Sequence, residues 1–214
     1  MDLVNEAVSP ERALALSYAP AEGWAALTAL FALDDRLRRI TRVARDPTVG
    51  LMRLTWWADA LVSLDTAPPP AEPLLTSLAR EVLPHGVTGA AMAGMVDGWE
   101  RLLAGDPLDH DAFAAERGGR LFALAATVLA ATDARVERMG EGWALIDLAQ
   151  GWSEYAAGRE MGAGRLNTMY RSSWPRPLRP LGAQGLSALA DARGEPAGSP
   201  RRVGRLLWHR LTGR

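Results

Sequence analysis

The chain has 214 residues, with 24 Lys+Arg against 25 Asp+Glu and no cysteine. This length suffices for one sizeable domain with its own core, and the lack of cysteine excludes disulfides, thiolate nucleophiles and cysteine-ligated metals. All 24 basic residues are arginine. We interpret this as compositional bias and not as a binding surface for nucleic acid, so we expect no nucleic-acid partner.

The start of the chain, MDLVNEAVSPER, carries acids where a signal peptide has a basic segment and an apolar core. No run of about 18 apolar residues, the length of a membrane-spanning helix, occurs in the sequence. We therefore expect a soluble protein of the cytoplasm.

Helix signals dominate the chain, and strand signals are nearly absent. Ser9-Pro10, Asp46-Pro47 and Ser199-Pro200 each place an N-cap residue before a proline at the first helical position. β-Branched residues are few, and alternation of apolar and polar residues is missing. The pattern predicts an all-α fold with helices over residues 10–17, 21–44, 47–64, 72–82, 87–104, 111–131 and 135–158.

Two adjacent aspartates, Asp34 and Asp35, lie in the predicted helix LFALDDRLRR. The apolar face of this helix is made by Leu30, Leu33, Leu37 and Ile40. The two carboxylates diverge by about 100° on the helical wheel, so they do not converge on one ion. Arg38 and Arg39 follow four residues later, in the order that stabilises a helix by roughly 0.2–0.5 kcal/mol per pair. We interpret the two aspartates as ion-paired charges and not as a metal site.

A second acidic group, Asp106, Asp109 and Asp111 with His110, has the residue types of a metal site. The group lies in a loop that enters a predicted helix, where acids stabilise the positive end of the helix dipole. We interpret it as helix capping. No phosphate-binding loop, dinucleotide fingerprint, serine-hydrolase elbow or HExxH motif occurs in the sequence.

The composition changes after Gly158. The stretch GREMGAGRLNTMYRSSWPRPLRPLGAQG shows no helical period, and only the end of the chain regains one. We therefore expect a helical domain over residues 1–168 and an irregular basic tail over residues 169–214 that ends in a short helix.

Basic charge is concentrated toward this end of the chain, since residues 159–214 contain 11 arginines and three acids. The last segment, SPRRVGRLLWHRLTGR, opposes arginines with an apolar face made by Leu206, Leu207, Trp208 and Leu211. Two interpretations stay open: this helix packs back on the domain, or it contacts a membrane surface.

The most specific motif follows the second predicted helix. The pattern G-x-x-R-L-x-W-W-x-D-x-L is matched in order by Gly50, Arg53, Leu54, Trp56, Trp57, Asp59 and Leu61. With the preceding YAPAEGWAALTALFALDDRLRR, and with ERGGRLFALAATVLA and MGEGWALIDLAQGWSEYAAGREMGAGRL further on, this pattern resembles the squalene/phytoene synthase family. The resemblance covers about residues 9–168.

The resemblance implies an isoprenoid-synthase-like helical cup. In that family two aspartate-rich motifs face each other across the cup and hold Mg²⁺, which stabilises the diphosphate leaving a prenyl substrate. The first motif would fall on residues 36–40, where no acid occurs, and the second on residues 151–155, where only Glu154 remains. Arg36, within the first motif, would repel Mg²⁺ if it faced the cup.

A weak metal site is the alternative. Asp147 lies on one helical stripe with Gly151 and Glu154, at i, i+4 and i+7, so Asp147 and Glu154 are the candidate metal ligands. We expect no cofactor, with Mg²⁺ as the alternative.

The resemblance also implies four substrate-binding candidates, each with a structural alternative. Arg53 and Arg165 would contact a diphosphate, or would form ion pairs and bonds to carbonyls. Trp57 would line a prenyl pocket, or would pack in the core, since Trp56 and Trp57 point to different faces. Glu154 would contact metal and substrate, or would be a charge on a solvated helix face.

Three functions are compatible with these features. We expect a degenerate, C-terminally shortened family member that acts as an interaction or assembly module on a protein partner, or that binds a prenyl lipid. A mitochondrial branch of the same superfamily, which assembles respiratory complex I, similarly lacks the full acidic motifs. The alternative is an active Mg²⁺-dependent prenyl transferase that condenses prenyl diphosphates head to head.

Overall fold

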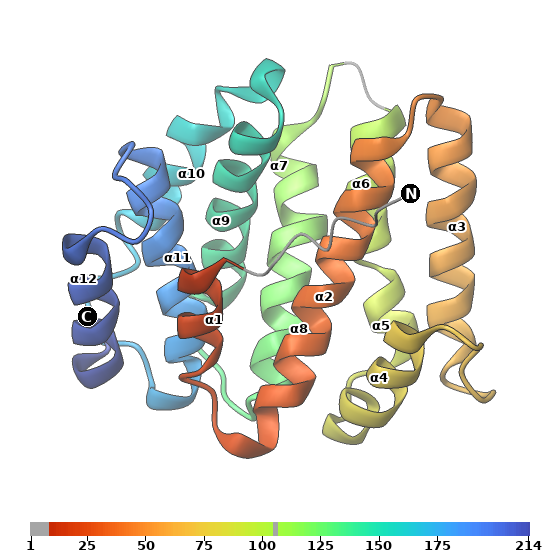
Figure 1. The fold of residues 1–214 in the computed structure, drawn as a ribbon, viewed down its shortest axis with the longest axis horizontal. Coiled ribbons are helices and arrows are strands. Elements are labelled where there is room, and N and C mark those ends of the chain that lie inside the picture. Colours follow the sequence, from red (N-terminus) through yellow and green to blue (C-terminus); the bar gives the residue numbers. More distant parts are fainter. Residues whose placement is uncertain (1–8, 105–106) are drawn as a thin grey trace.

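Every regular element is helical in the computed structural model, which describes residues 9–104 and 107–214 (Figure 1). The predicted all-α class is therefore confirmed. In chain order the elements are α1 (Pro10–Leu16), α2 (Ala21–Val43), α3 (Pro47–Ser63), α4 (Pro73–Glu81), η1 (Leu83–His85), α5 (Gly89–Ala93), α6 (Val96–Ala104), α7 (His110–Ala114), η2 (Ala115–Gly119), α8 (Arg120–Val128), α9 (Val136–Gly151), η3 (Ser153–Tyr155), α10 (Gly158–Leu166), η4 (Arg176–Leu178), α11 (Arg179–Ala192) and α12 (Pro200–Thr212).

The three predicted helix starts are present. Ser9 Oγ accepts a hydrogen bond from the backbone N–H of Arg12 at 3.2 Å, and Asp46 Oδ1 accepts one from the backbone N–H of Thr48 at 2.8 Å. Ser199 is the N-cap residue of α12. A proline follows each cap at a position where a helix has no use for its N–H, so these starts are set locally by the sequence.

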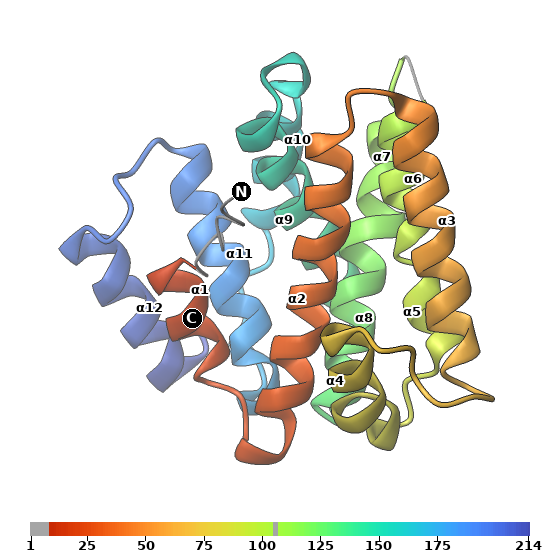
Figure 2. The same cartoon turned by 45° about the vertical axis from the view of Figure 1, so that its right-hand side comes forward.

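Helix α2 runs through the middle of the bundle and contacts α3, α4, α6 and α8 (Figure 2). Its predicted apolar face is buried, and the buried residues include Leu30, Leu33, Leu37 and Ile40. Asp34 lies on the flank of this face and is only 1% exposed. A carboxylate at such a position requires a partner, because burial of an unpaired charge is very costly.

Two of the predicted helices are interrupted. The segment 87–104 forms α5 and α6, with Gly94 ending α5. Between α7 and α8 the chain makes the π-helical turn η2. In this turn Gly118 lies so close to Gly140 of α9 that a Cβ on either residue would overlap the carbonyl of the other. The wide turn and this close approach bring Arg117 to the surface of α9.

The prediction of an irregular tail over residues 169–214 is wrong for residues 179–192, which form the buried helix α11. Helix α11 packs on α9, α10, α1 and α12, so the expected boundary at residue 168 cuts through one packed unit. Helix α11 is rich in small residues, so its sequence shows no clear helical period of apolar residues. A Cβ at Gly182 would meet the ring of His209, and one at Gly185 would meet the sulfur of Met139. The packing therefore needs small residues, which give little hydropathy signal.

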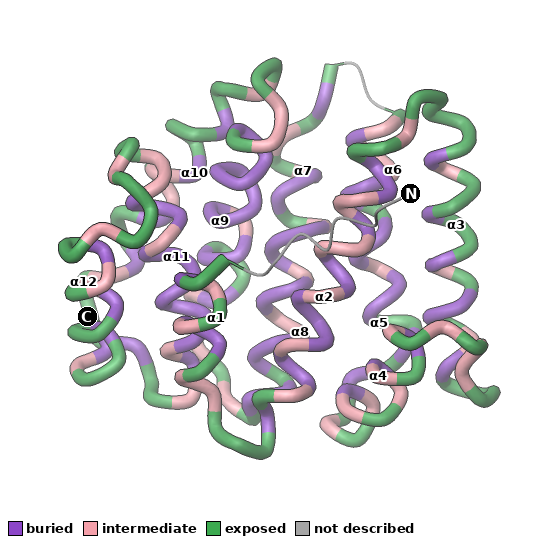
Figure 3. The backbone as a smooth tube through the Cα atoms, in the orientation of Figure 1, coloured by how far each residue is buried: buried purple, intermediate pink, exposed green. Residues whose placement is uncertain are grey.

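Helices α3 and α12 lie at opposite ends of the longest axis of the molecule, and buried residues concentrate between them (Figure 3). A second, smaller apolar cluster joins α1, α11 and α12 through Ala15, Ala183, Leu186 and Leu206. None of the described helices is both long enough and apolar enough to cross a bilayer.

Candidate functional site

A cavity of about 420 Å³ lies among α1, α2, α9, α11 and the start of α12. The charged and polar side chains that line it include those of Glu11, Arg12, Arg38, Asp147, Gln150, Gln184, Ser187, Asp191 and Arg202, and its apolar wall includes Trp143, Ile146 and Ala188. This volume is in the range of small-molecule sites, about 300–1,000 Å³. The family resemblance places its first acidic motif on residues 36–40 of α2 and its second on residues 151–155, which begin at the last residue of α9.

A buried ion pair is connected to this cavity through Asp147, although neither of its two residues lines the cavity. Arg117 of η2 donates from Nε and Nη2 to the two carboxylate oxygens of Asp34, at 2.9 and 2.8 Å. The side chains are 0% and 1% exposed. Two parallel bonds of this kind fix the relative orientation of both groups and give the strongest ion-pair geometry available to arginine.

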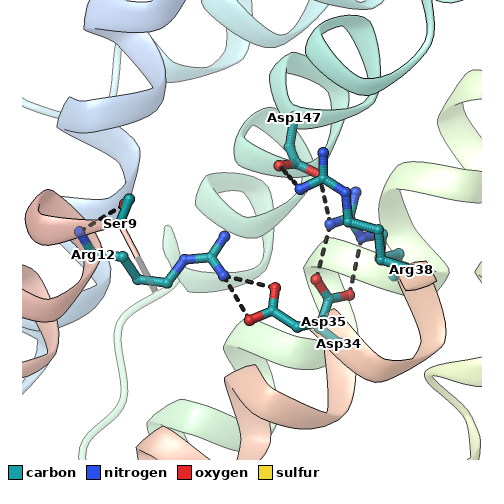
Figure 4. A network of polar contacts seen from close by, with 7 residues as sticks. Ser9, Arg12, Asp34, Asp35, Arg38 and Asp147 are labelled. Carbon is teal, nitrogen blue, oxygen red and sulfur yellow. Dashed lines mark hydrogen bonds and ion pairs between the residues drawn. The ribbon is translucent and has the colours of Figure 1, made fainter. Parts of the chain in front are cut away.

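Asp147 of α9 joins this pair to a second arginine. Its Oδ2 accepts from Nη2 of Arg117 at 2.7 Å, and its Oδ1 accepts from Nη1 of Arg38 at 2.9 Å (Figure 4). Burial alone would raise the pKa of Asp147, but the charges of Arg117 and Arg38 outweigh it and hold that pKa below its usual value. Asp147 is therefore ionised, and both of its carboxylate oxygens are bound by arginine.

Asp35 points away from Asp34 and pairs with α1. Nη1 of Arg12 donates to both of its carboxylate oxygens, at 2.7 and 3.0 Å (Figure 4). Burial raises the pKa of Asp35, and Arg12 opposes this rise. Burial would lower the pKa of Arg12, but the adjacent carboxylate raises it above its ordinary value.

Aromatic rings enclose the most buried guanidinium. The Cζ of Arg117 lies 4.2 Å from the ring centroid of Trp99, 4.8 Å from that of Trp143 and 5.8 Å from that of Phe113. The negative faces of aromatic rings attract a cation at these distances. Arg117 is thus held by both carboxylates and rings, without contact to solvent.

The carboxylates of Asp34, Asp35 and Asp147 form, with Arg12, Arg38 and Arg117, what we call the arginine–aspartate network. All six carboxylate oxygens in it accept a hydrogen bond from a guanidinium. Its three positive and three negative charges balance. Within the described ranges, no group of three or more His, Cys, Asp or Glu could hold a metal ion. The residues present therefore do not fit Mg²⁺, which needs carboxylate oxygens that are free to coordinate it.

The interpretation of Asp34 and Asp35 as ion-paired charges is confirmed, but the predicted partners are wrong. Arg38 reaches across to Asp147 instead of Asp34, and Asp35 pairs with Arg12 instead of Arg39. The buried position of Asp34 explains this, because it faces neighbouring elements and not its own helix surface. Arg117, the partner of Asp34, is 83 residues away in the chain.

Arg36 lies outside the cavity. Its Nη1 is 3.1 Å from Oε1 of Glu72, the N-cap residue of α4, and its Cζ lies 5.3 Å from the ring centroid of Trp57. The arginines that neutralise Asp34, Asp35 and Asp147 are thus Arg12, Arg38 and Arg117, and of these only Arg38 is expected from the sequence as an ion-pair partner. The only local signal was the ERGGR stretch, where two glycines follow Arg117.

Of the predicted site residues, only Asp147 lines the cavity. The predicted stripe of Asp147, Gly151 and Glu154 is wrong, because α9 ends at Gly151, Trp152 is extended and Glu154 lies exposed in η3. Asp147 and Glu154 therefore do not share a helix face, as a joint metal site would require.

The other candidates lie apart from the cavity. Arg53 is exposed on α3. Trp57 is buried and Trp56 is exposed, with their ring centroids 5.5 Å apart in an edge-to-face arrangement. The prediction that the two side chains point to different faces, and that one of them packs in the core, is confirmed. Arg165 forms ion pairs with Asp111 and, at 3.4 Å, with Glu141.

The capping interpretation of the second acidic group is confirmed at Asp109. Its Oδ1 accepts from the backbone N–H groups of Asp111 and Ala112 at the start of α7. His110 is the first residue of that helix. Asp106 lies outside the described residues.

Comparison with known proteins agrees with the fold. Residues 5–161 match the family model of squalene/phytoene synthase. The chain belongs to the squalene/phytoene synthase family, and its all-α bundle is consistent with the isoprenoid-synthase-like fold of that family. Neither the curated proteins nor the solved structures gave a match.

Proposed function

We propose that this chain is a family member that no longer ionises prenyl diphosphates and that acts as an interaction or assembly module. The observation that carries this proposal is the occupation of all six carboxylate oxygens of the arginine–aspartate network by guanidinium groups. Ionisation of an allylic diphosphate needs clustered cations at the leaving group. Here residues 36–40 hold no acid, and the three carboxylates that lie nearest to that position and on α9 are already neutralised.

Energetics support the same conclusion. To coordinate Mg²⁺, Asp34 and Asp147 would have to release Arg117, which has no access to solvent. Removing one partner from a buried ion pair typically costs about 3–5 kcal/mol. Mg²⁺ also gives up its hydration shell reluctantly, so this exchange is unfavourable.

The outer face of α3 supports an interaction role. Val49, Met52 and Trp56 lie at helical spacing on this face and are 43%, 68% and 49% exposed. Exposed apolar side chains that gather on one face are typical of protein contacts. We expect the protein partner of this module to contact α3.

The test is incubation of the purified chain with farnesyl or geranylgeranyl diphosphate and Mg²⁺, followed by measurement of diphosphate release. We expect no release above the rate without protein. Release that is abolished by Asp147→Asn, but not by Glu154→Gln, would contradict the proposal and would favour the alternative, an active Mg²⁺-dependent prenyl transferase. The Glu154 variant is the matched control, because it makes the same carboxylate-to-amide change at an exposed position.

A second candidate function, binding of a prenyl lipid without turnover, is favoured by the unsatisfied donors of the cavity. Arg38, Gln184, Ser187 and Arg202 line it, and one side-chain donor of each (Nε, Nε2, Oγ and Nε) is buried without a hydrogen-bond partner among the described residues. They lie beside an apolar wall, so a molecule with a polar head and an apolar body fits best. Saturable binding of farnesyl diphosphate in the same assay, without diphosphate release and weakened by Gln184→Leu, would favour this function.

A further inference from the structure

Helix α12 carries apolar side chains on the face that points away from the bundle. Its inner face, with Leu206 and His209, is buried. Its outer face carries Leu207, Trp208 and Leu211, which are 44%, 60% and 74% exposed. A helix at the edge of a bundle needs only one apolar face for its own packing. The outer face therefore has no role in the fold described here.

Arginines border this outer face. Beside Leu211 a surface hollow is lined by Ser17, Tyr18, Ala19, Pro20, Arg176, Pro177, Arg179 and Arg210, with no acidic side chain among them. Within residues 9–104 and 107–214, Arg176, Arg179 and Arg210 take part in none of the ion pairs. The Nε of Arg179 is buried and has no hydrogen-bond partner. The hollow thus gathers three arginines without an acidic partner among the described residues, of which Arg179 donates from Nη1 to the carbonyl oxygens of Arg210 and Leu211.

We propose that the α12 surface, made of Leu207, Trp208 and Leu211 with Arg176, Arg179 and Arg210, docks on an anionic lipid bilayer. The apolar side chains would enter the boundary between headgroups and acyl chains, and the guanidinium groups of the hollow would contact lipid phosphates. Amphipathic helices that lie in this boundary combine these two features. The amphipathic Trp ring is suited to the same depth.

Charge favours a lipid surface over a protein as the occupant. Residues 196–214 contain five arginines and no acid, and only two of the five, Arg202 and Arg205, pair with acids elsewhere among the described residues. By contrast, the exposed apolar face of α3 has Arg53 and Asp59, charges of both signs, close to it in the sequence. Each Arg near an anionic bilayer contributes roughly 1 kcal/mol of attraction. Helix α12 also lies at the outer edge of the molecule, where a flat surface can reach it (Figure 1).

The proposal is tested by co-sedimentation of the full chain with vesicles of phosphatidylcholine and phosphatidylglycerol in equal parts, against vesicles of phosphatidylcholine alone. We expect binding to the anionic vesicles, weakened by high salt, and little binding to the neutral ones. Leu211→Ser should lower the affinity about tenfold, because it removes apolar area that would be buried in the bilayer. Arg176→Gln and Arg210→Gln should each lower it about fivefold.

Matched variants at the other end of the molecule control for exposure and charge. Met52→Ser on α3 removes an apolar side chain of similar exposure, 68% against 74% for Leu211. Arg80→Gln on α4 removes one exposed arginine. Neither control should change vesicle affinity, and circular dichroism establishes that each variant is folded.

Three outcomes would overturn the proposal. They are equal binding to neutral and anionic vesicles, an effect of Met52→Ser as large as that of Leu211→Ser, and the absence of vesicle binding. If the chain instead forms dimers that Leu211→Ser disrupts, the α12 surface belongs to a second copy of the chain and not to a membrane.

Discussion

Arg117 is a guanidinium with no exposure to solvent, held by Asp34 and Asp147 and stacked against Trp99. Its charge is compatible with the core only because both carboxylates and the rings replace its hydration. In turn, Asp34 has no other ion-pair partner among the described residues. Asp34 and Arg117 therefore depend on each other, and the loss of either side chain should destabilise the folded chain.

We therefore expect Arg117→Met to lower the free energy of unfolding by about 3–5 kcal/mol, because it leaves Asp34 buried without a counter-charge. Urea unfolding at neutral pH measures this change. Arg101→Met, which breaks the more exposed pair with Glu116, is the control and should change the midpoint little. The double variant Arg117→Met/Asp34→Leu should recover part of the loss. An Arg117→Met midpoint equal to that of the unmodified chain would contradict this account.

The residue scale is also where prediction from sequence is weakest. The acid pair could be recognised as ion-paired from residue types and spacing alone. The partners could not, since helical periodicity relates residues three or four apart, whereas Arg12 and Arg117 come from other elements. A buried arginine is not distinguishable from a surface arginine in a chain whose basic residues are all arginine.

At the scale of elements, the helix starts could be predicted from the sequence, whereas the π turn η2 and the helix α11 could not. The Ser-Pro and Asp-Pro pairs specify α1, α3 and α12 through local geometry that needs no tertiary contact. The π turn η2 depends on the approach of α9, and α11 depends on glycines that admit His209 and Met139. Both features follow from packing between distant segments, so a local pattern does not reveal them.

Helix α12 has a buried titratable residue on its inner face. His209 is fully buried, its Nε2 lies 3.2 Å from the carbonyl oxygen of Arg179, and burial lowers its pKa to about 4. The unfolded chain, with an ordinary pKa of about 6.5, binds this proton more readily. The contribution of His209 to stability is therefore complete above pH 6.5 and is lost as the pH falls from about 6.5 towards about 4.

We expect the unmodified chain to lose up to about 3 kcal/mol more of its unfolding free energy than His209→Gln over that pH interval. Urea unfolding of both proteins at neutral pH and near pH 4.5 measures the difference, and titration of the shared carboxylates cancels in the comparison. If the unfolding free energies of the two proteins fell equally with pH, the folded chain would not hold His209 neutral.

At the scale of the whole molecule, the bundle has two apolar cores of different size. The large one surrounds α2, α8 and α9, and the small one joins α1, α11 and α12. Arg202 of α12 reinforces the small core through ion pairs with Glu11 of α1 and Asp191 of α11. Because α12 packs mainly on α11, its attachment depends on fewer elements than that of α9.

We expect the backbone amides of α12 to exchange with deuterium faster than those of α9, since local opening requires only the small core to separate. Leu206→Ala should accelerate exchange in α12 while leaving α2 and α9 unchanged. Hydrogen–deuterium exchange followed by mass spectrometry measures both effects. Uniform acceleration along the chain would instead mean that the two cores unfold together.

Guanidinium groups stay protonated in proteins, and here neighbouring carboxylates raise the pKa of Arg12 and Arg117 further. A histidine or lysine in their place would make the neutralisation of Asp34, Asp35 and Asp147 depend on pH. With arginine alone, this neutralisation persists throughout the physiological range, so a change of pH within that range does not free these carboxylates for another cation.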